Sequence, residues 1–166
     1  MRPKHNKTRT FNYGDSSEAI TLSKNLNGLD YLKGMESGEI PEAPAVTVLD
    51  IFINELDFGK ANFEFIPQDF HYNAVGTVHG GVISTILDTA MGCTLMSTLT
   101  KEFTFTTLEL KVNFIKAVTD KTGKMIAVGK IIHAGRTTAM VEASLIDVTG
   151  KIYAHATSTC LIMKKQ

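Results

Sequence analysis

The chain has 166 residues, enough for one domain that buries a core of its own. Hydrophobic residues make up 43% and charged residues 20%, which excludes a fibrous protein and a wholly disordered one. Lys and Arg together number 17, as do Asp and Glu, so no overall charge favours nucleic acid or an anionic membrane as a partner. An anionic ligand would have to be held by a local group of residues.

The sequence favours a cytoplasmic protein without a metal centre. Cys93 and Cys160 each lie in an apolar segment and match no metal-ligand spacing, so both are predicted to be reduced core thiols. The basic start, Met1 to Arg9, lacks the apolar stretch of a secretion signal. No apolar run reaches bilayer-spanning length, so membrane insertion is not expected.

Helices are predicted first along the chain. Between Ser17 and Ser37, apolar residues recur mostly at helical spacing around Gly28 and Gly34, which predicts one broken helix or two short ones. Residues 38–44 contain two prolines and are predicted to be an extended connector, because residues before proline are disfavoured in helices.

The rest of the sequence, from residue 46 onward, predicts six strands and one long helix. Strands are expected at residues 46–56 and 59–66, and residues 80–96, apolar on most sides, predict a buried helix. Four further strands are expected at residues 103–114, 124–133, 137–147 and 151–162. Because the last connections are short, neighbouring strands must be antiparallel. This order predicts an α+β domain, with a curved antiparallel sheet wrapped around the apolar helix.

Such a sheet leaves its edges exposed in a single copy. Pairing of two copies edge to edge is an economical way to cover them, so a homodimer is expected.

Asp88 lies in the middle of the apolar helix, among core-like residues such as Leu87 and Met91. An ionised carboxylate there is costly unless it meets hydrogen-bond donors, a counter-charge or water in a cleft. Such carboxylates often mark catalytic sites. The alternative is a surface aspartate on the polar stripe of this helix, and spacing alone does not decide between the two.

Gly80 and Gly81 open the same helix. Their N–H groups lack intrahelical partners and lie at the positive end of the helix dipole, as a developing oxyanion requires. Gly81 and Asp88 are two turns apart and share one helix face. A glycine pair can equally serve a tight helix entry. His79 is predicted to orient this loop, and Asn73 either holds a water or carboxylate or forms a turn.

The pattern Asn73-x-x-Gly76-x-x-His79-Gly80-Gly81, followed after six residues by Asp88, resembles the signature of the hotdog-fold acyl-CoA thioesterases, in particular the PaaI-like, phenylacetate-pathway group. The strand Thr106 to Phe114 and the segment Leu29 to Pro41 also resemble this group. The resemblance implies a single hotdog domain over 1–166, with a variable basic tail (1–20), an N-terminal helical extension (21–44) and a hotdog core (45–163).

The resemblance also implies roles for individual residues. Asp88 would activate a water or attack the thioester carbonyl, while the Gly80 N–H polarises the carbonyl oxygen. Asn73 would position the water or the carboxylate, His79 would support the Gly80 loop, and Thr107 would line the site. The family builds each site across a dimer interface, so a homo-oligomer, either a dimer or a dimer of dimers, would be required.

Four residues are candidates for binding the CoA part of the substrate: Gly81, Gly135, Arg136 and Thr137. Arg136 could hold a phosphate while Gly135 and Thr137 contact the pantetheine arm, although a β-turn with a solvated arginine explains the same residues. No cofactor is expected, because CoA is part of the substrate. Candidate residues for the acyl-pocket wall are Phe63, Phe65, Tyr72, Met91, Leu95 and Met96.

Two other functions fit the same pattern. One is a non-catalytic acyl-CoA-binding or sensor protein of the same fold. The other is a dehydratase of 3-hydroxyacyl thioesters, which would pair His79 with Asp88.

Overall fold

The computed structural model describes residues 7–165, so the first six residues of the predicted basic tail lie outside it. Two short helices come first: α1 (Ser16–Ser23) and α2 (Gly28–Ser37), as expected from the glycine-interrupted pattern. Asp15 caps α1 by accepting the Ser17 N–H, and Gly38 ends α2 in the left-handed conformation. Helix α1 begins at Ser16, inside residues 1–20, which were predicted to be a variable basic tail.

A third short helix, α3 (Pro44–Val48), replaces the end of the predicted connector and the start of the predicted first strand. Pro44 takes the first helical position, where a missing N–H costs no hydrogen bond and the fixed φ suits the helix. The first strand therefore begins at Ile51, and the prediction that it begins at Val46 is wrong.

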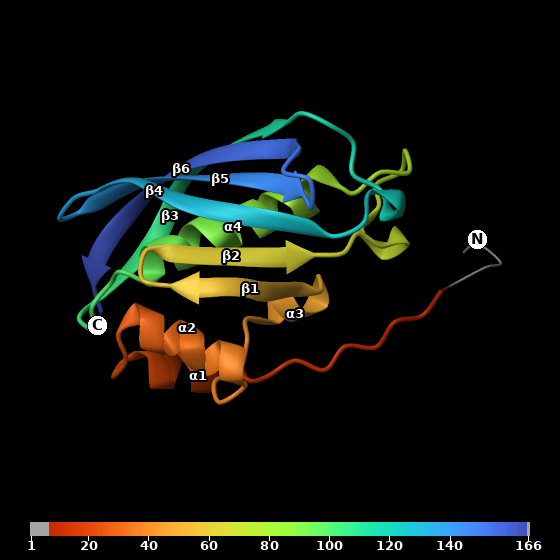
Figure 1. Ribbon diagram of the computed structural model, residues 1–166. Coiled ribbons are helices and arrows are strands. Elements are labelled where there is room, and N and C mark those ends of the chain that lie inside the picture. The colour runs from red at the N-terminus through yellow and green to blue at the C-terminus, as the bar shows by residue number, and fades with distance from the viewer. Residues whose placement is uncertain (1–6, 166) are drawn as a thin grey trace.

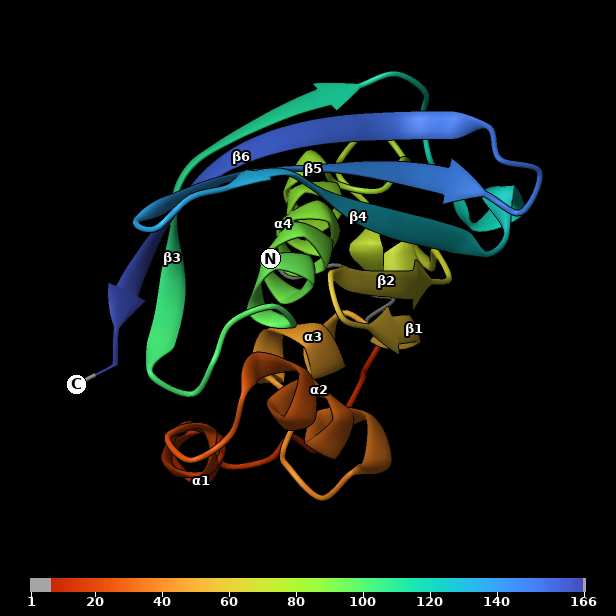
Figure 2. The same cartoon turned by 60° about the vertical axis from the view of Figure 1, so that its left-hand side comes forward.

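Six strands form one antiparallel sheet in the order β1-β2-β4-β5-β6-β3. Their bounds are β1 (Ile51–Asp57), β2 (Lys60–Phe65), β3 (Phe103–Phe114), β4 (Met125–Ala134), β5 (Thr138–Asp147) and β6 (Ile152–Lys164). The sheet curves around helix α4 (Gly80–Met96), as Figures 1 and 2 show. The predicted α+β architecture is thus confirmed.

The core lies between α4 and the concave face of the sheet. Ile86, Leu87 and Leu95 of α4 are fully buried, as are Met125 and Leu145 of the sheet. Gly129 of β4 allows the helix to approach closely. A Cβ atom at this position would lie 2.3 Å from Thr94 Oγ1 and 2.6 Å from the Ala90 carbonyl oxygen.

The two edges of the sheet have different surroundings. Helices α2 and α3 contact β1, and Figure 2 shows them on the open side of the curve below α4. The opposite edge is β3, where Leu108 and Phe114 are 58% and 55% exposed. In residues 7–165, no helix is both long and apolar enough to cross a membrane.

Candidate active site

Asp88 lines a cavity of about 290 Å³ that three parts of the fold enclose. Helix α4 contributes Asp88 and its neighbours one turn further along, the sheet contributes apolar side chains, and the helical N-terminal segment closes the remaining side. The lining residues are Tyr31, Leu32, Met35, Glu42, Ala43, Val46, Ile53, Phe63, Asp88, Thr89, Gly92, Cys93, Met96, Phe105 and Thr107. Asp88 is therefore a half-buried carboxylate facing a cavity, rather than a solvated surface residue.

Thr107 holds the Asp88 carboxylate. Its hydroxyl donates a hydrogen bond to Asp88 Oδ1 over 3.0 Å. A β-bulge follows Thr107, since the pairing of β3 with β6 shifts register between Thr107 and Glu109. Bulges redirect side chains locally, and here Leu108 becomes an exposed extra residue while Thr107 faces the cavity. The structure thus brings together two of the predicted site residues.

Two thiols lie close to the carboxylate. Burial and the adjacent Asp88 charge raise the pKa of Cys93 to about 12. Burial, together with the Asp88 charge, also raises the pKa of the Cys160 thiol above its usual value. Both residues are free thiols, as predicted. Because only a thiolate is strongly nucleophilic, neither cysteine competes with Asp88 at neutral pH.

The predicted oxyanion donor lies at the N-terminal end of α4, about two turns before Asp88. His79 is the N-cap of the helix, and its Nδ1 accepts the Gly81 N–H over 2.8 Å. This bond occupies the Gly81 donor. For the Gly80 N–H, no acceptor is found within residues 7–165. A Cβ atom on Gly80 would lie 3.0 Å from Phe114 Cζ, so the glycine allows the Phe114 ring to pack closely against the start of the helix.

Asn73 organises the loop that leads to this helix. Its Oδ1 accepts the N–H groups of Val75 and Thr77, over 2.9 and 3.2 Å, and its Nδ2 donates to Thr77 Oγ1 over 3.0 Å. These contacts are those of a turn residue. Asn73 also lines a second cavity, of about 350 Å³, together with Gly80 and Phe114.

The two cavities are separate within one chain. The cavity beside Gly80 does not include Asp88, and the cavity beside Asp88 includes neither Gly80 nor His79. Asp88 is eight positions after Gly80 on α4, which corresponds to about 12 Å along a helix that rises about 1.5 Å per residue. A carbonyl group within reach of Asp88 is therefore out of reach of the Gly80 N–H of the same chain.

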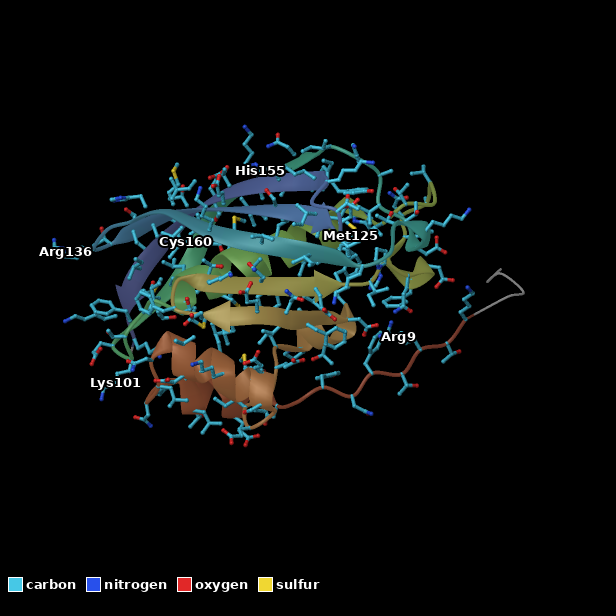
Figure 3. All side chains as sticks on the ribbon, viewed as in Figure 1. Arg9, Lys101, Met125, Arg136, His155 and Cys160 are labelled. Atoms are coloured by element: carbon cyan, nitrogen blue, oxygen red, sulfur yellow. The ribbon has the colours of Figure 1, made fainter. Side chains whose placement is uncertain are left out.

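The remaining CoA-binding candidates lie together at the connection between β4 and β5. Gly135, Arg136 and Thr137 are all exposed, and the Gly135 N–H donates to the Thr138 carbonyl over 2.8 Å. Figure 3 shows the Arg136 side chain at the tip of this hairpin, extending away from the body of the domain. None of the three lines the cavity beside Asp88.

The acyl-pocket candidates separate into two groups. Phe63 and Met96 do line the cavity beside Asp88, whereas Phe65, Met91 and Leu95 are fully buried core residues. Tyr72 instead donates its hydroxyl to Asp120 over 2.8 Å. Among the described residues, no cluster of His, Cys, Asp and Glu suits a metal ion.

The cavity residues that the sequence did not predict come mainly from the N-terminal helices and β3: Tyr31, Leu32, Met35, Glu42, Val46 and Phe105. These residues were predicted to lie in the N-terminal helices, in the connector or, for Val46 and Phe105, in strands. No periodicity shows which face of a short helix covers a site far away in the sequence. An apolar pattern between Leu29 and Met35 was the only available signal.

Known proteins resemble this chain in sequence over the segment that contains the candidate site. Residues 75–154, which include Gly80, Asp88 and Thr107, match the family model described as the Thioesterase superfamily. A protein of Saccharolobus solfataricus that is named a putative esterase is 28% identical over 116 residues, covering 70% of this chain and 81% of that protein.

Two solved structures extend the comparison to the fold. One is a phenylacetic acid degradation-related protein from Ralstonia eutropha JMP134, which is named a putative thioesterase. It is 27% identical to this chain, with a TM-score of 0.72, and the match covers 79% of this chain and 98% of that one. The other is smu.793 from Streptococcus mutans UA159 bound to acetyl CoA, with 26% identity and a TM-score of 0.63, covering 70% and 90% of the two chains. Residues 75–154 are thus similar to the Thioesterase superfamily, the sheet and central helix have the hotdog fold of these relatives, and the chain is a thioester hydrolase.

Proposed function

We propose that this protein hydrolyses acyl-CoA thioesters to the free acid and CoA, with Asp88 as the catalytic carboxylate. The observation that carries the proposal is the carboxylate itself: it faces a largely apolar cavity and is held by Thr107, and the pKa of the Cys93 thiol beside it is raised to about 12. A partly desolvated and oriented carboxylate is suited to act as a general base or a nucleophile.

The chemistry balances with water as the only other reactant. As a general base, Asp88 takes a proton from a water molecule while the water oxygen bonds to the thioester carbon. The tetrahedral intermediate then collapses, the carbon–sulfur bond breaks, and the proton passes to the leaving CoA sulfur. As a nucleophile, the Asp88 carboxylate would instead bond to the thioester carbon, the carbon–sulfur bond would break and CoA would leave as a thiolate. Water would then hydrolyse the resulting mixed anhydride, which releases the free acid and restores the carboxylate.

In this proposal, the two subunits of a dimer share each site, and the oxyanion donor comes from the subunit that does not provide Asp88. The negative charge on the carbonyl oxygen needs a donor at about 3 Å, and the Gly80 N–H of the same chain is about 12 Å away along α4. We assign this role to Gly80 of the partner subunit. The long edge strand β3, with exposed Leu108 and Phe114, offers the surface for edge-to-edge pairing.

The loop residues play supporting roles in the same scheme. His79 fixes the entry to α4 through the Gly81 N–H, and Asn73 shapes the loop before it, so both orient the oxyanion donor. Binding of acetyl CoA by the Streptococcus mutans relative supports a CoA-type ligand. We propose that Arg136, with Gly135 and Thr137, provides one exposed contact for its phosphates.

The test is steady-state hydrolysis of hexanoyl-CoA by wild-type protein and Asp88→Asn. Free CoA is measured with a thiol-reactive chromophore, and a blank without substrate corrects for the half-buried Cys93 and the buried Cys160. We expect kcat to fall at least about 100-fold, the usual contribution of an acid–base group. Asp30→Asn makes the same chemical change at an exposed position on α2 and should leave kcat unchanged.

Other outcomes would contradict the proposal. Wild-type kcat in Asp88→Asn would remove Asp88 from the reaction. Tight binding of acyl-CoA without CoA release would identify a binding protein, and hydration of an enoyl-CoA would identify a dehydratase.

A further inference from the structure

The cavity beside Asp88 carries a distinctive charge pattern. Most of its lining is apolar, and only Asp88 and Glu42 carry ionisable carboxyl groups. No lysine, arginine or histidine of the described residues lines it. The cavity therefore has negative charge and no cation to balance it.

Glu42 belongs to the N-terminal segment, between α2 and α3. It is half-buried, and its Oε2 accepts one long hydrogen bond of 3.4 Å from Thr47 Oγ1. Within residues 7–165, Glu42 forms no ion pair. Its charge is consequently available to act on a ligand in the cavity.

We propose that this cavity takes the acyl part of the thioester, that it selects neutral apolar acyl groups, and that Glu42 rejects those ending in a carboxylate. An apolar chain is stabilised by contacts with Met35, Met96 and Phe105. An acyl group with a terminal carboxylate would bring a third negative charge into a partly desolvated space, where like charges repel more strongly than in water. Repulsion of an unwanted ligand is a common source of specificity.

The acyl chain used in the test must be short. A neighbouring cavity of about 190 Å³ shares Tyr31, Met96 and Phe105 with the first and is lined also by Lys165. A long dicarboxylic chain that extended into it would meet this cation. A five-carbon glutaryl group keeps its carboxylate nearer to Glu42.

The experiment compares glutaryl-CoA with hexanoyl-CoA, which has similar length and no distal charge. The inference rests on the proposed thioesterase function, so binding is measured as well, with the non-hydrolysable thioethers S-hexyl-CoA and S-(4-carboxybutyl)-CoA. We expect the wild-type protein to prefer the neutral member of each pair. Glu42→Gln removes the charge at nearly constant shape and should raise the glutaryl-to-hexanoyl ratio of kcat/KM about tenfold.

Glu36→Gln is the matched control, because it removes the same charge from an exposed position on α2 that does not line the cavity. It should leave the ratio at the wild-type value.

An unchanged ratio in Glu42→Gln, or equal wild-type use of both esters, would overturn the inference while leaving the thioesterase function intact. If neither ester is hydrolysed, the proposed function fails, and the thioether pair alone decides whether Glu42 discriminates. Absence of thioether binding would overturn both.

Discussion

Asp88 is effective as a catalytic carboxylate only if it points toward the substrate, and a single side chain fixes that direction. The Thr107 hydroxyl donates to Asp88 Oδ1 over 3.0 Å from a strand that is itself bent by a bulge. The other carboxylate oxygen has no described hydrogen-bond donor in residues 7–165 and is left to meet a water or a carbonyl carbon. In the proposed mechanism, Thr107 is therefore a positioning residue.

Replacing Thr107 by valine tests this role. Valine keeps the shape of threonine and removes the donor, so we expect kcat for hexanoyl-CoA to fall about tenfold with little change in KM, because a misdirected carboxylate costs rate rather than binding. Thr107→Ser restores the hydroxyl and should recover most of the rate. Equal kcat values in the valine, serine and wild-type proteins would show that the hydrogen bond does not orient Asp88.

Single residues were predictable where their chemistry conflicts with their surroundings. Asp88 stood out because a carboxylate in an apolar helix is costly, and the thioesterase resemblance assigned Thr107 to the same site. Nothing in the sequence marked Glu42 as a cavity residue, because it lies two positions before Pro44 in the segment predicted to be an extended connector. Its place in the cavity depends on how α2 and α3 pack against α4, which local sequence does not encode.

At the scale of elements, the loop before α4 depends on a histidine that the sequence did not single out. His71, in the 3-10 helix η1 (Asp69–His71), is only 1% exposed. Its Nδ1 accepts the Gln68 N–H over 3.0 Å, which leaves Nε2 as the donor to the Leu49 carbonyl over 3.1 Å. The His71 carbonyl accepts the His79 N–H over 2.8 Å. The neutral ring therefore ties the start of the active-site helix to the rest of the domain.

This arrangement predicts a pH dependence of stability. Burial lowers the pKa of His71 below its usual value of 6.5, and protonation at Nδ1 would break the bond from Gln68. The unfolded chain thus takes up this proton more readily than the folded one. Stability is fully present above pH 6.5 and falls as the pH drops below it.

Chemical denaturation between about pH 7 and pH 5 measures the effect, whose slope for one proton cannot exceed about 1.4 kcal/mol per pH unit. His71→Asn is expected to be less stable than wild type at neutral pH but to lose part of the pH slope. His133→Asn, at an exposed histidine, is the comparison and should keep the wild-type slope. Identical slopes in all three proteins would rule out His71 as the source.

Elements were predicted well where one physical signal dominated. The apolar stretch from Gly80 to Met96 is the central helix, and the turn sequences separated the last four strands correctly. α3 was missed because its five residues are too few for periodicity and its proline was taken as a sign of extended chain. The same proline is favourable at the first position of a helix, so the local sequence allowed both structures.

At the scale of the whole molecule, the proposed site is incomplete in one chain. Asp88 lies in the middle of α4 and the Gly80 N–H at its start, and the two line different cavities. Thr107, which binds the Asp88 carboxylate, belongs to the edge strand β3, so a second copy paired along this edge would lie near the carboxylate. Sequence alone predicts such pairing from exposed edges but cannot show which residues it brings together.

Complementation between two inactive variants tests this arrangement. Gly80→Pro removes the N–H, and proline suits this position because it is the first of α4 and His79 is already extended, with φ −61° and ψ 135°. Gly80→Ala keeps the N–H and is the control for added bulk beside Phe114. We expect Gly80→Pro and Asp88→Asn each to be nearly inactive as homodimers, and Gly80→Ala to retain clearly more activity than Gly80→Pro.

The two inactive variants are then co-expressed with different tags and the mixed dimer is purified. If each site takes Asp88 from one chain and Gly80 from the other, the mixed dimer has one intact site and one doubly defective site, and its kcat per dimer should reach about half the wild-type value. If each chain carries its own complete site, both sites of the mixed dimer are defective and activity stays at the level of the parent variants. Recovery of activity in the mixed dimer therefore depends on a site shared between subunits, because neither chain alone retains both groups.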